Sequence, residues 1–145
     1  MTKQTLESTT YWLLVQTAIR TKHDFARLAE LYDLSVMQLI TLCSLQPGIP
    51  TPMNQISCLL ACDASNITGI VDRLVRRGLI ERTESPEDRR VKVVLLTDKG
   101  AYLRDHVIQE VVTTQPESMA NLSREEFEQL NILLTKALLP KPKTA

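Results

Sequence analysis

Hydrophobic residues recur at helical spacing along most of the chain, and this pattern predicts a mainly α-helical protein. A long first helix is expected from about residue 9 to residue 34. A second helix is expected over 36–45, with Ser35 as the residue that caps its N-terminus. Both segments carry apolar residues on one side, so each is expected to pack against a core.

Two short helices are predicted next, close together in the sequence. Thr51 and Pro52 predict a helix start, with a capping hydroxyl followed by proline at the first helical position. The side chains expected to face inward on this helix are Met53, Ile56, Leu59 and Leu60. The following helix, over 64–77, is expected to be capped by Asp63 and closed by Gly78.

After this helix the hydrophobic period changes from that of a helix to that of a strand. The runs "LIERTE" and "VKVVLL" are alternating or β-branched, and the polar segment "SPEDRR" separates them. This pattern predicts a hairpin with a polar tip. Two short helices joined by a tight turn and followed by a hairpin make a winged helix-turn-helix. The predicted fold class is therefore mainly α with a small β-hairpin wing.

Helical periodicity resumes after the hairpin and continues to the C-terminal region. These helices and the long first helix lie outside the winged helix-turn-helix. Their apolar faces need a partner to cover them, and this predicts a two-fold dimer. We therefore predict three parts: an N-terminal dimerisation helix at 1–34, a winged helix-turn-helix at 35–100 with its wing at 79–96, and C-terminal dimerisation helices at 101–145.

The predicted helix over 64–77 has two faces of different chemistry. Its apolar stripe consists of Ile67, Ile70, Val71, Leu74 and Val75. Its other face carries Ser65, Asn66, Thr68 and Gly69, followed by Arg73 and Arg76. A helix face that meets only water more typically carries Glu and Lys, which favour helical structure more than Ser, Asn, Thr and Gly. A helix face with short hydrogen-bonding side chains in its first half and arginines in its second half is suited to DNA base edges and phosphates.

The distribution of charge favours a local site over diffuse attraction. The chain has 17 basic and 17 acidic residues, so net charge neither requires nor excludes a polyanion. No Lys or Arg occurs in residues 28–72, whereas residues 73–92 contain seven basic and four acidic residues. Positive charge is therefore concentrated on the last part of the predicted DNA-binding region.

From Met53 to Gly100 the sequence resembles the MarR family of winged helix-turn-helix transcriptional regulators. The motif "SNITGIVDRLVRRGLIERTESPEDRRVKVVLLTDKG" carries the resemblance, with its acidic-any-arginine triplet at the wing and the later "LT-x-x-G". The resemblance implies a recognition helix in the major groove, a wing arginine at a minor groove and terminal helices that dimerise. The predicted DNA-binding residues are Ser65, Asn66, Thr68, Gly69, Arg73, Arg76, Asp88, Arg89 and Arg90.

The resemblance also implies a function for the whole chain. We expect a cytoplasmic, homodimeric transcriptional regulator of the repressor type, which binds a palindromic double-stranded DNA operator. Family members often bind an aromatic or phenolic effector beside the DNA-binding lobe. The residues predicted to border such a pocket are Tyr11, Trp12, His23, Tyr32 and Met37. Aromatic residues at helical spacing usually pack in a core, so a core role is favoured for these residues over the pocket.

Two other functions remain open. A winged helix can dock a protein without binding DNA, and a thiol pair at Cys58 and Cys62 can sense oxidants. Free cysteines are commonly small buried hydrophobes, and we expect this for these two and for Cys43. Zinc needs about four ligands, and no such cluster is present in the sequence, so no metal or cofactor is expected. No enzyme motif, signal peptide or membrane-spanning run is recognisable.

Overall fold

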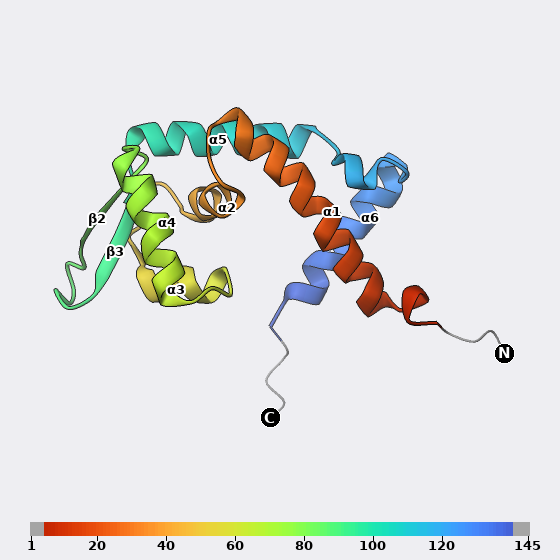
Figure 1. Cartoon of the computed structure of the whole chain (residues 1–145), viewed down its shortest axis with the longest axis horizontal. Helices are drawn as coiled ribbons and strands as arrows, with labels where there is room; N and C mark the ends of the chain where they lie inside the picture. The colour runs from red at the N-terminus through yellow and green to blue at the C-terminus, as the bar shows by residue number, and fades with distance from the viewer. Residues whose placement is uncertain (1–4, 141–145) are drawn as a thin grey trace, which may run out of the picture. The chain divides into compact units, whose positions relative to one another are not determined.

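The computed structural model describes residues 5–140, which are mainly helical and include a small antiparallel sheet (Figure 1). The elements are, in chain order, η1 (Leu6–Ser8), α1 (Thr10–Leu31), α2 (Val36–Ser44), β1 (Thr51–Pro52), α3 (Met53–Leu59), α4 (Ala64–Arg76), β2 (Ile80–Glu84), β3 (Lys92–Leu96), α5 (Asp98–Thr113), η2 (Glu117–Met119) and α6 (Arg124–Leu138). The order and type of these elements confirm the predicted fold class.

The chain forms two compact units. The central unit comprises Lys22–Thr114, and the terminal unit combines Met1–Thr21 with Gln115–Ala145. The central unit contains the whole predicted helix-turn-helix and wing. The predicted dimerisation segments extend at both chain ends into residues 1–4 and 141–145, which lie outside the described residues. No helix in residues 5–140 combines the length and the apolar character that a membrane crossing requires.

Three helix boundaries in the central unit are fixed by local signals, and the structure confirms the two that were predicted, at Ser35 and Gly78. Ser35 and Gln38 form a capping box, since each side chain accepts a hydrogen bond from the other residue's backbone N–H. The Thr97 hydroxyl accepts a hydrogen bond from the Gly100 backbone N–H at 3.0 Å at the start of α5. Gly78 ends α4 with φ of +66°, a backbone conformation that glycine adopts without steric cost.

The prediction of a helix start at Thr51 and Pro52 is wrong in one respect. These two residues form β1, which pairs with β3 so that the sheet order is β1-β3-β2. Pro52 precedes α3 in an extended conformation, with φ of −61° and ψ of 142°, and the Thr51 hydroxyl donates to the Ile49 carbonyl at 3.3 Å. The predicted two-stranded hairpin is therefore part of a three-stranded sheet, because extended backbone before a helix can pair with an available strand edge.

The hairpin itself forms as predicted. β2 and β3 pair antiparallel from Ile80↔Leu96 to Glu84↔Lys92. Figure 1 shows the two strands extending beside α4, with the connecting loop at the end distant from the start of β2. Since β3 is the middle strand, its Val93 and Val94 side chains are buried. The hairpin is thus anchored at its base, and its tip extends outward.

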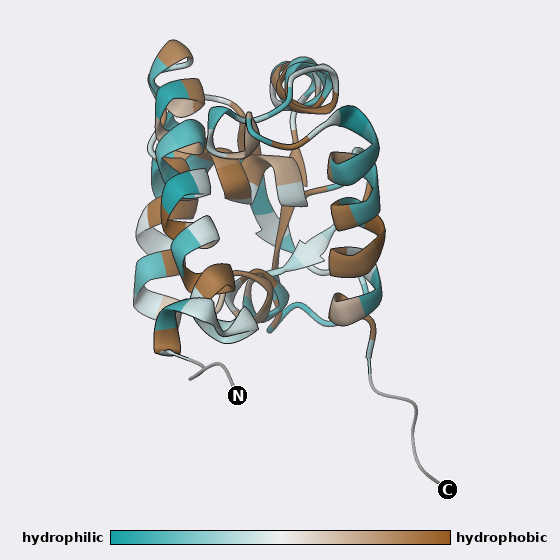
Figure 2. Ribbon diagram, turned by 90° about the vertical axis from the view of Figure 1, so that its right-hand side faces the viewer, coloured by the Kyte–Doolittle hydropathy of each residue, from teal (hydrophilic) through white to brown (hydrophobic). Residues whose placement is uncertain are grey.

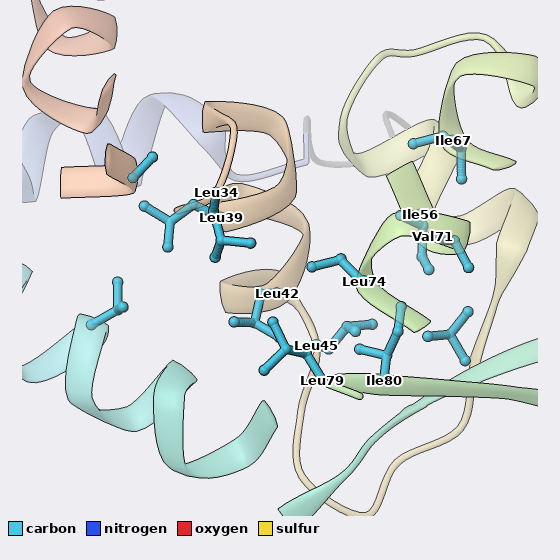
Figure 3. Close-up of a cluster of buried hydrophobic side chains, with 13 residues drawn as sticks. Leu34, Leu39, Leu42, Leu45, Ile56, Ile67, Val71, Leu74, Leu79 and Ile80 are labelled. Atoms are coloured by element: carbon cyan, nitrogen blue, oxygen red, sulfur yellow. The ribbon is translucent and has the colours of Figure 1, made fainter. Parts of the chain in front are cut away.

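A single cluster of aliphatic side chains joins the helices of the central unit to the sheet (Figure 3). Its labelled members are Leu34, Leu39, Leu42, Leu45, Ile56, Ile67, Val71, Leu74, Leu79 and Ile80, and each is at most 7% exposed. Fully burying an aliphatic side chain of this size stabilises a fold by about 1.5–3 kcal/mol. Three members lie on α4, so the core fixes which face of that helix points outward.

Two side chains that were expected in the core lie at its edge or outside it. Leu59 is 62% exposed, at the last residue of α3, and Val75 is 37% exposed. Leu59 follows Ile56 by three residues, yet α3 has only seven residues and ends there. The short helix therefore buries one side chain fully, Ile56, where the hydrophobic pattern predicts several.

The helices of the terminal unit carry large apolar side chains that are exposed. α6 begins with a capping box, in which the Ser123 N–H donates to Glu126 Oε2 at 2.8 Å. In Figure 2, the helix that leads to the C-terminus shows brown, hydrophobic segments between teal, hydrophilic ones. Within the terminal unit, the large exposed apolar side chains on α1 and α6 are Tyr11, Leu13, Leu14, Ile19, Ile132, Leu133 and Leu138.

Candidate nucleic-acid interface

The outer face of α4 carries all six residues that were predicted for it. Ile67, Val71 and Leu74 are at most 1% exposed and hold the helix against the core. The residues of the opposite face are all exposed, namely Ser65, Asn66, Thr68, Gly69, Arg73 and Arg76. One rigid helix therefore presents short polar side chains in its first half and two guanidinium groups in its second half.

The N-terminal turn of α4 has backbone donors that the helix itself cannot pair. The first N–H groups of any α-helix lack intrahelical acceptors. Asp63 occupies the N-cap position, as predicted, but its side chain makes no capping hydrogen bond. Backbone N–H groups and the positive end of the helix dipole favour an anion such as a phosphate oxygen. This end of the helix is suited to the DNA backbone.

Gly69 keeps the middle of the outer face flat. A Cβ atom placed on Gly69 has no heavy atom within 4 Å, so nothing in the fold requires glycine at this position. Glycine inside a helix costs about 1 kcal/mol of stability relative to alanine. A destabilising residue with open space in front of it is typical of a helix that another molecule approaches closely.

An ion pair that the sequence analysis missed connects α4 to β2. Asp72 Oδ1 lies 3.1 Å from Arg82 Nη2. Asp72 follows Gly69 by three residues and Arg76 follows Asp72 by four, so the carboxylate shares the outer face of α4 with them. The helical spacing in the sequence could have placed Asp72 on this face, although nothing in the sequence identifies Arg82 as its partner.

Backbone and side-chain hydrogen bonds define the wing tip. The Ser85 N–H donates to the Val91 carbonyl at 2.8 Å, and the Val91 N–H donates to the Asp88 carbonyl at 2.9 Å. Asp88 Oδ1 accepts a hydrogen bond from the Arg90 backbone N–H at 2.9 Å. The Asp88 carboxylate therefore shapes the turn, and this leaves the exposed Arg89 and Arg90 side chains at the tip.

The helix that precedes α4 offers only neutral polar groups. Asn54 and Gln55 of α3 are exposed, and the Ser57 hydroxyl donates to the Met53 carbonyl at 3.2 Å. Side chains of α3 could therefore contact phosphates only through neutral hydrogen bonds. Binding to DNA would depend more on the arginines of α4 and of the wing, since neutralised phosphates supply most of the salt-dependent affinity.

The residues predicted for an effector pocket are distributed over both units. Tyr11 and Trp12 belong to the terminal unit, and His23, Tyr32 and Met37 belong to the central unit. Tyr32 donates a hydrogen bond to Glu110 Oε2 at 2.9 Å, and burial together with this bond raises the pKa of Tyr32. The pocket itself stays a prediction.

A cavity of about 230 Å³ lies elsewhere in the central unit. It is formed by the end of α2, the loop after it and α3, and its lining contains none of the predicted effector residues. The lining residues are Ser44, Leu45, Gln46, Ile49, Pro50, Thr51, Gln55, Ile56 and Leu59, all of them uncharged.

The expectation that all three cysteines are buried is wrong for Cys58, which is exposed on α3. Cys62 lies beyond the end of α3 and is half-buried, so the two thiols do not share one helix. Burial raises the pKa of the Cys43 thiol, although the nearby Arg104 opposes the shift.

Within residues 5–140, no three His, Cys, Asp or Glu side chains come together to hold a metal ion.

Comparison with known proteins identifies relatives of this chain. Residues 34–92 match the model of the MarR family. The chain is 34% identical to the HTH-type transcriptional repressor NicR of Pseudomonas putida over 106 residues, which cover 73% of this chain and 67% of NicR. It is 32% identical to the multiple antibiotic resistance protein MarR of Escherichia coli over 107 residues, which cover 73% of this chain and 74% of MarR.

A solved structure agrees with this relationship. The apo form of E. coli MarR matches the fold with a TM-score of 0.78 at 26% identity, and the match covers 90% of this chain and 97% of that one. The chain therefore belongs to the MarR family of winged helix-turn-helix transcriptional regulators.

Proposed function

We propose that this protein is a sequence-specific regulator of transcription that acts by binding double-stranded DNA. The observation that carries the proposal is the outer face of α4, where exposed small polar residues precede two exposed arginines. In the proposed complex, α4 enters a major groove and the 85–90 loop of the wing follows the neighbouring minor groove.

The chemistry of each part supports this arrangement. Ser, Asn and Thr side chains can donate to or accept from base edges, and Gly69 lets the helix backbone come close to them. Arginine is always charged and planar, which suits phosphates, guanine edges and the narrow minor groove. A mutant E. coli MarR has been solved in complex with operator DNA, and its fold matches this chain with a TM-score of 0.72.

We propose further that the protein acts as a homodimer. Leu13 and Ile19 on α1 are 54% and 50% exposed, and Ile132 and Leu138 on α6 are 68% and 84% exposed. A second copy would remove such side chains from water and contribute about 25 cal/mol for each Å² of apolar surface buried. Two-fold symmetry implies a palindromic operator, with half-sites about 10 bp apart or a multiple of that distance.

The direction of regulation and its control are part of the same proposal. NicR is a transcriptional repressor, and repression is the outcome we propose for this chain. A small aromatic or phenolic effector would lower the affinity for DNA if it binds more tightly to a conformation unfit for the operator.

Regulation by binding requires no catalytic step, so we propose that the protein is not an enzyme. Its cytoplasmic location stays a prediction.

Selection of binding sites from random duplexes with the purified protein tests this proposal. The expected result is enrichment of a site with two half-sites related by a two-fold axis. A site with a single half that is not repeated would contradict the homodimer. Absence of any enriched sequence, with the fold verified by circular dichroism, would contradict sequence-specific binding and favour a protein-docking winged helix.

A further inference from the structure

The C-terminal ends of α1 and α4 have the same hydrogen-bonding pattern. At the end of α1, the Leu34 N–H donates to the Ala29 carbonyl at 3.0 Å and the Asp33 N–H donates to the Glu30 carbonyl at 3.1 Å. Asp33 has φ of +53°. This is a Schellman motif, a helix ending that leaves the last carbonyls without partners in the helix.

α4 ends in a Schellman motif of its own. The Leu79 N–H donates to the Leu74 carbonyl at 3.1 Å, and the Gly78 N–H donates to the Val75 carbonyl at 2.8 Å. The cap residue between the helix and Gly78 is Arg77. Its side chain therefore leaves α4 at the last turn, next to the outward-facing Arg76.

The guanidinium of Arg77 caps the end of α1. Arg77 Nη2 donates to the Tyr32 carbonyl at 2.9 Å, and Nη1 donates to the Asp33 carbonyl. Nη1 also lies 3.6 Å from Asp33 Oδ2. A cation at a helix C-terminus is stabilised by the dipole and satisfies carbonyls that have no partner within the helix. The two amino groups of Arg77 are thus both engaged within the fold.

α5 in turn caps the end of α4. Lys99 Nζ donates to the Arg77 carbonyl at 3.1 Å, and the Thr97 hydroxyl donates to the Gly78 carbonyl at 2.7 Å. The start of α5 thus binds the end of α4, and the end of α4 binds the end of α1. Within the central unit, the C-terminus of α1 is therefore capped by Arg77, and the C-terminus of α4 is capped by residues at the start of α5.

We infer that Arg77 is a positioning residue for DNA recognition, which fixes the C-terminal end of α4 to the end of α1 and does not itself contact DNA. This inference rests on the proposed function. Consecutive residues of a helix point about 100° apart. Arg76 faces outward with the DNA-binding residues, whereas Arg77 faces α1, so the two adjacent arginines have different tasks.

Fixing one end of α4 matters because base contacts are expected at its other end. α4 has 13 residues and is therefore about 20 Å long. A tilt of about 5° around the fixed end would move Ser65 and Asn66 by roughly 1.5 Å, for a helix with a rise of 1.5 Å per residue. Hydrogen bonds to base edges operate within a few tenths of an ångström, so this shift would break them.

Arg77→Gln, Arg77→Lys and the matched variant Arg76→Gln test the inference. Dissociation constants for the selected operator are measured over a series of salt concentrations, and stoichiometric titration gives the active fraction of each protein. We expect Arg77→Gln to weaken operator binding on the order of tenfold, with the salt slope of the wild type. Arg77→Lys keeps the charge but not the planar fork, and should lie between the wild type and Arg77→Gln.

Arg76→Gln should behave differently, because it removes a group that faces the DNA. We expect its salt slope to fall by about one, as for a lost phosphate contact. Asp33→Asn keeps the backbone carbonyl and tolerates the left-handed conformation, so it should bind like the wild type. A loss equal to that of Arg77→Gln would assign the effect to the Asp33 carboxylate and overturn the carbonyl cap.

Two further outcomes would overturn the inference. If the active fraction of both Arg77 variants binds the operator with the affinity of the wild type, Arg77 has only a structural role. If Arg77→Gln lowers the salt slope as Arg76→Gln does, Arg77 contacts phosphate. Failure of the wild-type protein to bind any duplex would contradict the proposed function instead, so the two failures are distinguishable.

Discussion

The carboxylate of Asp72 on α4 pairs with the guanidinium of Arg82 on β2, with 3.1 Å between Oδ1 and Nη2. The two side chains are 41% and 39% exposed, so the pair itself contributes about 0–1 kcal/mol to the free energy of unfolding. Its larger effect concerns charge. The pair holds one negative group on the face of α4 that also carries Arg73 and Arg76, and it joins α4 to β2 of the wing.

Asp72→Asn should therefore strengthen binding to random-sequence duplex. Removing one negative charge a few ångströms from a phosphate relieves repulsion of about 1 kcal/mol in water, which corresponds to about a fivefold gain in affinity. Fluorescence anisotropy with a labelled random duplex measures the change. Glu128→Gln on α6, where the carboxylate pairs with Arg124 at 3.3 Å, is the matched control. An equal gain in both variants would show that Asp72 does not face DNA.

Gly69→Ala should raise stability and lower DNA affinity. The open space at Gly69 accepts a methyl group, and alanine stabilises a helix by about 1 kcal/mol relative to glycine. The same methyl group would obstruct close approach of a base edge. Urea unfolding and operator titration measure the two effects. Unchanged operator affinity in a stabilised variant would place DNA away from this part of α4.

Gly100→Ala should have the opposite effect on stability. A Cβ atom at this position would lie 1.8 Å from the Leu79 carbonyl oxygen, so the backbone at the start of α5 must shift. We expect a loss of about 1–3 kcal/mol, as for overpacked sites. A midpoint of urea unfolding equal to that of the wild type would mean that α5 moves away from Leu79 without cost.

Arg90→Ala should weaken operator binding by about 1–3 kcal/mol and leave the fold intact. The side chain is exposed at the wing tip, and the turn is held by the Asp88 carboxylate and the Arg90 backbone N–H. Arg124→Ala on α6 removes the same charge from an exposed site outside the predicted interface and should have little effect. If both variants bind the operator equally well in a gel-shift titration, the wing takes no part in binding.

Asn66→Ala should relax the base preference more than it changes the salt dependence. Asn66 is exposed in the first turn of α4, where we expect a side chain to reach base edges as well as phosphates. Site selection with the variant and the wild type compares their preferences at each position of the operator. Asn131→Ala on α6 is the control for loss of an exposed amide. Equal losses on operator and random duplex would assign Asn66 to the DNA backbone.

Local signals in the sequence were sufficient to predict most of the fold. Ser35 and Ser123 are followed three residues later by Gln38 and Glu126, and both capping boxes form. The end of α4 is predictable from one residue, Gly78, because glycine tolerates the positive φ that this position requires. The exposed face of α4 also follows from helical spacing alone, because the apolar stripe fixes which side is buried.

The features that the sequence does not predict depend on contacts between distant segments. β1 forms because Thr51 and Pro52 meet the free edge of β3, which lies about 40 residues later in the chain. Arg77 belongs to the basic segment that favours DNA, yet its guanidinium binds carbonyls at the end of α1. Helical spacing assigned Arg76 and not Arg77 to the outer face of α4, but it did not identify the carbonyls at the end of α1 as the partners of Arg77. Only the tertiary arrangement assigns the two arginines to different partners.

The affinity of the purified protein for duplex DNA, measured over a series of salt concentrations, decides whether α4 and the wing bind DNA. We predict measurable binding to random duplex in dilute buffer, which declines as salt is added, and much tighter binding to a selected palindromic site. A natively folded protein that binds neither duplex at the lowest salt concentration would contradict this prediction.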